Sequence, residues 1–176
     1  PRDGLQNEKR LVSTQDKLRL VEKAIEFGAR RIEVTSFVNP RRVPQLADAE
    51  ELIALLPDRG DVTYIGLVLN QRGAQRALAQ PTIDELGAVC ITSDSFGMRN
   101  QGQTSAESLE SAMDIVRMAQ ADGRSSQITI ATAFGCPFEG EVDPAKVVEM
   151  AKRASEVAPR EISLADTIGV ATPAEV

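Results

Sequence analysis

The sequence predicts an α/β fold, a (β/α)8 TIM barrel that is incomplete in this chain. Segments with helical periodicity alternate about five times with short apolar segments typical of strands, in repeats of roughly 30 residues. This alternation is typical of a parallel sheet with helices outside it. A complete barrel needs eight units and about 250 residues. We therefore expect residues 1–176 to form a single partial catalytic domain of about five and a half units, without the first strand and the C-terminal units.

Short apolar segments with turn-forming residues at their ends are expected to be the strands. They are residues 31–35, 62–68, 88–92, 128–132 and 161–164. The polar residues that could carry chemistry follow these segments, and in a barrel the residues after the strands lie together on one catalytic rim. We therefore favour the barrel over the structural alternative, a doubly wound open sheet.

Capping patterns mark the beginnings of the helices. Ser13 with Asp16, and Thr104 with Glu107, resemble capping boxes. Asp143 before a proline is a favourable N-cap and first turn. The polar segment 93–105 is expected to be a loop of the length that often carries function. The expected helices are residues 14–27, 45–56, 71–79, 105–122 and 144–157, and residues 172–175 resemble the start of another.

The composition excludes several classes of protein. The net charge of −6 and the pI of about 4.8 argue against a nucleic-acid-binding face. No apolar run approaches the roughly 18 residues of a transmembrane helix. The two cysteines, Cys90 and Cys136, do not suggest a disulfide framework, so we expect a cytoplasmic protein, or a mitochondrial matrix protein in a eukaryote. Because the sequence has no histidine, a histidine base or metal ligand is excluded within these residues.

Arg2 and Asp3 stand side by side at the N-terminus, followed by Gly4. Aspartate is a hard oxygen ligand for a divalent metal, and arginine suits a carboxylate, enolate or thioester oxygen. A solvated N-terminal turn is the simpler interpretation of this short pattern. Glu33 lies 31 residues after Arg2, about one βα unit, inside a strand where an unpaired charge is costly. We expect Glu33 to pair with Arg2, either to orient it or as a structural ion pair.

Further polar residues follow the later strands. Asn100 lies after the strand at 88–92, and Asp166 and Thr167 follow the last strand. Asp166 could support catalysis or contact substrate, or it could cap local backbone amides. Cys136 lies between glycine and proline in a turn, and with no histidine to activate it we expect a structural role.

Segments along nearly the whole chain resemble motifs of the 3-hydroxy-3-methylglutaryl-CoA lyase family, in order and in spacing. The short pattern Arg-Asp-Gly-x-Gln would indicate only the wider DRE-TIM metallolyase group. The longer first motif and the Gly-Cys-Pro loop indicate the lyase branch. The matching segments are residues 1–8 (PRDGLQNE), 33–40 (EVTSFVNP, continuing to VPQ at 43–45), 134–140 (FGCPFEG) and 161–169 (EISLADTIG).

The resemblance implies a retro-Claisen cleavage of a 3-hydroxy-acyl-CoA to acetyl-CoA and a carbonyl fragment, acetoacetate in the type reaction. Asp3 matches the family's aspartate ligand to Mg²⁺ or Mn²⁺, which lowers the pKa of the substrate hydroxyl. Arg2 matches the arginine that stabilises the enolate, and Glu33 matches the acid that orients this arginine.

The resemblance also implies supporting contacts and partners. Gln6, Asp166 and Thr167 fall where the family has polar contacts, and we expect Asn100 to contact the substrate. We count Asp166 with the catalytic residues Arg2 and Glu33. The expected partners are an acyl-CoA substrate and a second copy of the chain in a homodimer, with neither nucleic acid nor membrane.

Several features of the family are absent from these residues. They include a His-x-His pair of metal ligands, a later asparagine ligand and the cysteine of a mobile glycine-rich loop, which Cys136 does not match. We therefore expect this chain to bind metal poorly and to be inactive alone. Residues 93–102 differ from the typical form, which leaves the acyl group open. The alternatives are a related aldolase or Claisen-type acyltransferase, or a non-catalytic half-barrel that binds a partner through its open edge.

Overall fold

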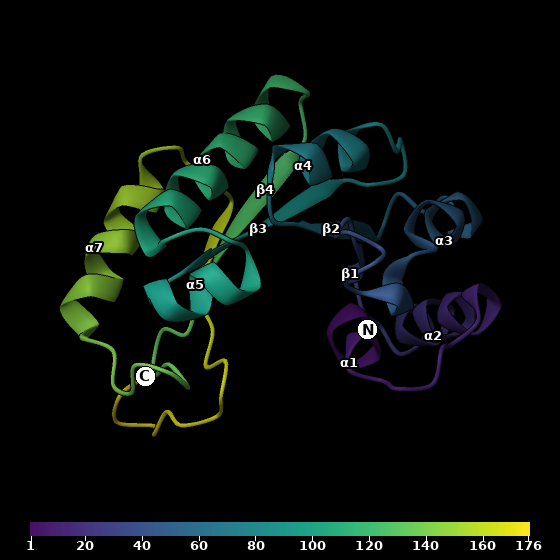
Figure 1. The fold of residues 1–176 in the computed structure, drawn as a ribbon. Coiled ribbons are helices and arrows are strands. Elements are labelled where there is room, and N and C mark those ends of the chain that lie inside the picture. The colour runs from purple at the N-terminus through teal and green to yellow at the C-terminus, as the bar shows by residue number, and fades with distance from the viewer.

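The computed structural model describes residues 1–176 and contains one five-stranded sheet (Figure 1). The strand order in space is the order in the chain, and all neighbouring strands are parallel. A doubly wound sheet reverses its strand order at a switch point, and this sheet does not. The strands are β1 (Arg31–Ser36), β2 (Thr63–Val68), β3 (Glu85–Ile91), β4 (Ser125–Ala131) and β5 (Glu161–Leu164).

Helices connect the strands and lie along the outer side of the sheet (Figure 1). This arrangement satisfies the requirement that parallel strands be joined by crossover connections. The helices are α1 (Arg2–Gln6), α2 (Thr14–Glu26), the 3-10 helix η1 (Pro44–Leu46), α3 (Ala49–Leu55), α4 (Gln71–Leu78), α5 (Asp94–Asn100), α6 (Ser105–Ala121) and α7 (Pro144–Ser155).

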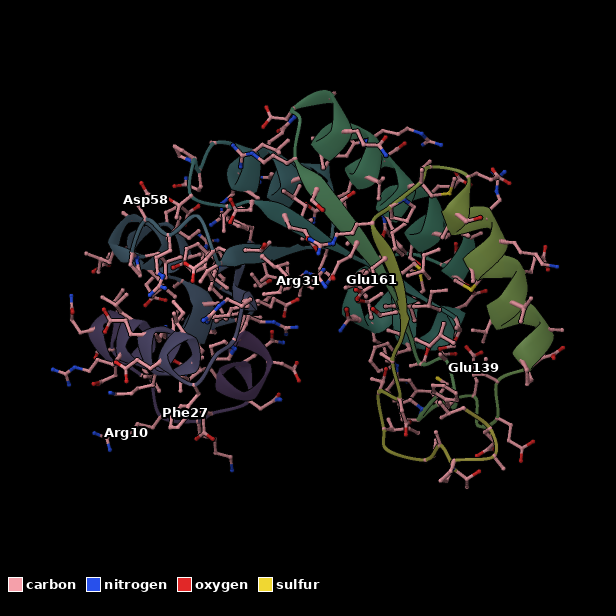
Figure 2. All side chains as sticks on the ribbon, turned by 180° about the vertical axis from the view of Figure 1, so that it is seen from behind. Arg10, Phe27, Arg31, Asp58, Glu139 and Glu161 are labelled. Carbon is pink, nitrogen blue, oxygen red and sulfur yellow. The ribbon has the colours of Figure 1, made fainter.

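The sheet is curled as in a barrel. Neighbouring strands lie about 4.8 Å apart, so in a flat sheet β1 and β5 would be separated by about 19 Å. Instead, Arg31 of β1 forms an ion pair with Glu161 of β5, with 3.0 Å between Nη1 and Oε2. Figure 2 shows both residues in the middle of the molecule, with helices around the outside. The predicted partial barrel is therefore confirmed, and the open doubly wound sheet is excluded.

The two faces of the sheet differ because side chains alternate along each strand. Ile32, Leu86 and Ile128 are buried against the helices in one hydrophobic core. Gln127 and Thr129 of β4 lie on the opposite face, which is only half-buried. The inner face is thus polar and partly open at β4, whereas Ile65 and Leu67 of β2 are buried. No helix of the chain has both the length and the apolar character that crossing a membrane requires.

The predicted caps are confirmed. The Ser13 side chain accepts the backbone N–H of Asp16, and Thr104 with Glu107 forms a complete capping box. The side chain of Asp143 accepts the N–H of Ala145 at 2.8 Å. Each of these contacts satisfies a donor that the first turn of a helix would leave unpaired.

Residues Arg2–Gln6 form the short helix α1, where a solvated turn was the simpler interpretation. Two local predictions were wrong. The helix expected at 45–56 is divided into η1 and α3, because Pro44 opens a separate short turn. The segment 93–105 is not a loop throughout, because its residues Asp94–Asn100 form α5. The helix start expected at residues 172–175 is present as one turn: the N–H of Val176 donates to the carbonyl of Thr172 at 3.3 Å, and the N–H of Thr172 donates to Oε2 of Glu175 at 2.7 Å.

Candidate active site

The helix α1 places Arg2 and Gln6 on one face, because residues four apart in a helix are neighbours. Nη1 of Arg2 donates to Oε1 of Gln6 at 2.9 Å. Nη1 also lies 3.1 Å from Oδ1 of Asp3. The Arg2 side chain is only 12% exposed, although it lies at the start of the chain. Its conformation is therefore fixed by its neighbours.

Glu33 completes this arrangement from the adjoining strand. Its Oε1 accepts Nε of Arg2 at 2.6 Å, which confirms the pairing predicted from the spacing. The other oxygen, Oε2, lies 3.5 Å from the position that a Cβ on Gly87 would occupy. The carboxylate of Glu33 therefore lies against Gly87 of β3 on the inner face of the sheet.

Nη2 of Arg2 is the part of the guanidinium that remains available. Nε and Nη1 are the atoms that contact Glu33, Gln6 and Asp3. Nη2 makes no hydrogen bond within the chain. It is also not buried, so its N–H groups are accessible to a ligand. A rigid, charged donor with accessible N–H groups suits an oxygen on which negative charge develops.

Asp3 is exposed, with 86% of its side chain accessible. Its carboxylate has the chemistry that Mg²⁺ and Mn²⁺ prefer, but these ions need several oxygen ligands. The chain contains no group of three or more aspartate, glutamate, cysteine or histidine side chains that could hold a metal ion. These residues alone therefore do not form a complete metal site, and no chemical step through a metal follows from them.

A cleft of about 370 Å³ lies beside the Arg2 cluster. Gln6, whose side chain accepts from Arg2, is one of its walls, and Asn100 at the end of α5 is another. The structure therefore brings together two of the residues expected to contact substrate. We call this space the Gln6 cleft; its polar walls include Gln6, Asn39, Arg42, Asn70, Asn100 and Gln103.

Asp166 and Thr167 lie after β5 and contact backbone instead of the Arg2 cluster. Both carboxylate oxygens of Asp166 accept backbone N–H groups, from Val170 at 3.0 Å and from Ala171 at 2.9 Å. These amides hold the pKa of Asp166 below its ordinary value. Oγ1 of Thr167 accepts the N–H of Thr132 at 2.7 Å, where the backbone has the uncommon φ of 57°. Their predicted roles toward substrate stay predictions.

The loop that contains Cys136 supports α5. Sγ of Cys136 lies 2.9 Å from Oγ of Ser93, the N-cap of α5. Glu139 of the same loop, labelled in Figure 2, accepts the N–H of Ser95 at 2.7 Å. The contacts predict that this loop fixes the position of α5, whose last residue is a wall of the Gln6 cleft.

Neither cysteine is expected to react with a maleimide in the native protein at neutral pH. Burial raises the pKa of the Cys90 thiol to about 12, and Cys136 is also buried. The thiolate is the reactive form, and neither thiol is accessible. Mass spectrometry after brief labelling should find both unmodified, and labelling in denaturant should modify both. Fast native labelling of Cys136 would contradict its packing against Ser93.

Sequence reasoning missed the function of Gln45. This buried side chain accepts the N–H of Val12 at 2.9 Å and donates to the carbonyls of Glu8 and Arg10. It therefore fastens the segment that follows α1 and helps to hold Arg2 in place. The signal in the sequence was weak, because glutamine in a proline-containing segment ordinarily indicates an exposed turn.

Comparisons with known proteins agree with these motifs. The sequence matches the HMGL-like family over residues 1–176. The chain belongs to the HMGL-like family. It is 41% identical to the mitochondrial hydroxymethylglutaryl-CoA lyase of Mus musculus over 173 residues, which are 98% of this chain and 53% of the relative. It is 37% identical to the (R)-citramalyl-CoA lyase of Chloroflexus aurantiacus, and covers 58% of that protein with 100% of its own length.

Solved HMGL-like structures have the same fold. An HMG-CoA lyase from Acinetobacter baumannii, in complex with coenzyme A and 3-methylmalate, superposes with a TM-score of 0.93 at 36% identity. The superposition covers 99% of this chain and 57% of that one. The chain thus spans about half the length of the relatives it matches, which agrees with a partial barrel.

Proposed function

We propose that the full-length protein that carries this chain is an acyl-CoA lyase. It cleaves 3-hydroxy-3-methylglutaryl-CoA, or a close analogue, to acetyl-CoA and acetoacetate or the corresponding analogue. Membership of the HMGL-like family supports the reaction class. The observation that carries the proposal is the Arg2 guanidinium, which Glu33 and Gln6 hold by Nε and Nη1 while Nη2 remains free.

The chemistry explains why a fixed arginine is useful. The substrate hydroxyl loses its proton, the carbon–carbon bond breaks, and the electron pair of that bond forms the enolate of acetyl-CoA. Nη2 of Arg2 donates to the enolate oxygen and stabilises the negative charge as it develops. Protonation of the enolate carbon gives acetyl-CoA. This chain has no histidine and no exposed cysteine, so we assign the proton transfers to residues outside it.

Glu33 acts through Arg2 and is a positioning residue. We propose that Gln6 and Asn100 contact the acyl group, since both line the Gln6 cleft. Asp166 and Thr167 are proposed to support the substrate from the end of β5, through the backbone that they hold in place.

A coupled assay of acetyl-CoA release from the full-length protein tests the proposal. We expect cleavage of 3-hydroxy-3-methylglutaryl-CoA, with citramalyl-CoA as the comparison because one relative is a lyase for that thioester. Faster cleavage of citramalyl-CoA would reassign the acyl group. Condensation of acetyl-CoA without cleavage would favour a Claisen-type acyltransferase. No reaction with any thioester would overturn the lyase proposal.

We retain the prediction that Mg²⁺ or Mn²⁺ is the cofactor and that Asp3 supplies one of its ligands. Asp3→Asn in the full-length protein is expected to weaken Mn²⁺ binding by at least about tenfold, because an amide oxygen carries no charge for a hard cation. Calorimetric titration of the metal-free protein with Mn²⁺ measures this directly. Asp61→Asn, at an exposed carboxylate paired with Arg59, is the control. Equal affinities in both variants would remove Asp3 from the ligand set.

The assembly and location are also proposals. We propose a homodimer, which light scattering of the purified full-length protein tests. We place the protein in the bacterial cytoplasm, or in the mitochondrial matrix if its source is eukaryotic, because the relative from Mus musculus is mitochondrial.

A further inference from the structure

The backbone of Thr132 is strained where β4 ends. Its φ is 57°, in the left-handed region that glycine adopts freely and that a β-branched residue rarely enters. The side chain is fully buried, so the surrounding structure holds this conformation in place. Strained residues of this kind gather at functional sites, where the strain serves to fix a geometry. The hydrogen bonds around Thr132 show which geometry it fixes.

Thr132 is the extra residue of a β-bulge between β4 and the segment after β5. The bonds of a regular parallel ladder are evenly spaced, and one residue bonds to two residues that lie two positions apart on the neighbouring strand. Ala165 instead donates to the carbonyl of Ile130 at 2.9 Å and accepts the N–H of Ala133 at 3.1 Å. The bulged strand thus contains one residue more than the ladder requires, and the N–H of Thr132 is released from the ladder.

The released N–H is used to hold Thr167, which is proposed above to support the substrate. It donates to Oγ1 of Thr167 at 2.7 Å. A hydroxyl group has one proton to donate and two lone pairs that accept. Because Oγ1 of Thr167 accepts here, its own proton is directed elsewhere, and it donates to no other group of the chain. Thr167 is exposed, so this proton is available to an oxygen of a bound ligand.

The hydroxyl of Thr132 stabilises the left-handed backbone. Its Oγ1 lies 2.6 Å from the carbonyl oxygen of Ala131 and 2.7 Å from Oγ1 of Thr92, which is also buried. Oγ1 of Thr92 lies 2.9 Å from the carbonyl oxygen of Thr132. These contacts join the bulge to the end of β3, and the bond to Thr167 joins it to the segment after β5. The bulge is therefore held on both sides.

We propose that Thr132 is a positioning residue for the lyase reaction: its strained bulge holds the Thr167 hydroxyl with its proton directed at an oxygen of the bound substrate. Thr132 itself does not touch the substrate, because it is fully buried. A donor that is already oriented needs no rearrangement when the substrate reacts. Bulges beside active sites commonly re-aim a side chain in this way. The inference rests on the acyl-CoA lyase function proposed above.

The test removes the hydroxyl of Thr132 from the full-length protein and keeps the shape of the side chain. Thr132→Val is expected to lower kcat/KM for 3-hydroxy-3-methylglutaryl-CoA about tenfold, because the strained backbone loses its supporting bonds and Thr167 is no longer held. Thr132→Ser retains the hydroxyl and should retain nearly full activity. Thr132→Gly should recover most of the activity that valine loses, since glycine adopts a φ of 57° without strain.

A double-mutant cycle distinguishes positioning from structural support. Thr167→Val alone is expected to lower kcat/KM by a similar factor. In the Thr167→Val background, Thr132→Val should cause little further loss, because the group that Thr132 positions is already absent. Independent losses that multiply would overturn the inference. Full activity in Thr132→Val, or lower activity in Thr132→Gly than in Thr132→Val, would also overturn it.

Thr63→Val is the matched control, at the first residue of β2 and thus at the opposite end of the sheet, and it should leave kcat/KM unchanged. Circular dichroism checks that each variant is folded. If Thr132→Val does not fold, Thr132→Ala, which also lacks the hydroxyl, takes its place in the cycle. No cleavage by the unaltered protein would overturn the proposed function, and the inference with it. Cleavage by the unaltered protein with independent losses in the cycle would overturn the inference alone.

Discussion

Arg2→Gln is expected to lower kcat of the full-length protein on the order of 10³-fold, with little change in fold. Arg2 provides the free Nη2 donor at the place where the Gln6 cleft begins. Loss of one such donor ordinarily costs about 10²–10³ in kcat, and here the donor also carries a charge. The effect should appear in kcat and not in KM, because the enolate exists only after the bond has begun to break.

Three measurements define this result. The coupled assay gives kcat, circular dichroism checks the fold, and Arg19→Gln controls for the lost charge. Arg2→Lys should recover little activity, because an ammonium cannot donate to Glu33, Gln6 and the substrate with the fixed geometry of a guanidinium. Full activity in Arg2→Gln would show that another group stabilises the enolate.

The Arg2–Glu33 pair could be predicted from the sequence because the contact joins neighbouring βα units. The spacing of 31 residues places Glu33 on the strand next to the N-terminal motif, and the ion pair of 2.6 Å confirms it. The helix caps were predictable for a similar reason, since each depends on residues within one turn. Local periodicity therefore predicts most of the fold, and the spacing of one βα unit predicts the Arg2–Glu33 pair at the centre of the candidate site.

Two kinds of feature could not be predicted from the sequence. One is a contact that exists only because the sheet is curved, and the other is a site that forms where separate loops meet. The Gln6 cleft has walls from α1, from the segment after β1, from the end of β2 and from the end of α5. The segment 93–105, which contains α5, was polar enough to resemble a loop, yet Gly97 lets it pack tightly. A Cβ at Gly97 would overlap the carbonyl oxygen of Gln103. When two backbone segments approach this closely, the only sign of the contact in the sequence is the glycine itself.

The strongest example of such a distant contact is a charged cluster at the amino ends of the strands. Glu85 of β3 is fully buried and accepts from Arg31 of β1, from Arg160 at 3.2 Å and from Ser125 at 3.2 Å. Arg31 also reaches Glu161 of β5. Burial disfavours the charged guanidinium, but the hydrogen bonds that it donates to Glu85 and Glu161 outweigh this effect, so the pKa of Arg31 lies above its ordinary value. The cluster exists only because the sheet curls.

Arg31→Met is therefore expected to lower the free energy of unfolding by about 3 kcal/mol. Removing one partner of a buried ion pair ordinarily costs about 3–5 kcal/mol, because it leaves an uncompensated charge. We expect the lower end of this range because Arg160 still contacts Glu85 in the variant. Urea denaturation followed by circular dichroism measures the loss. Arg19→Met, which breaks an exposed pair with Asp16, should cost no more than about 1 kcal/mol.

A second substitution distinguishes the buried charge from lost packing. Glu85→Gln in the Arg31→Met background should restore part of the stability, because a neutral amide costs less to bury than a carboxylate. With the single variant Glu85→Gln, these proteins form a double-mutant cycle, which isolates the interaction energy of the two side chains. We expect strong coupling, since Glu85 has no exposure to water. Additive effects would mean that the pair does not hold the curled sheet together and that β1 and β5 approach for another reason.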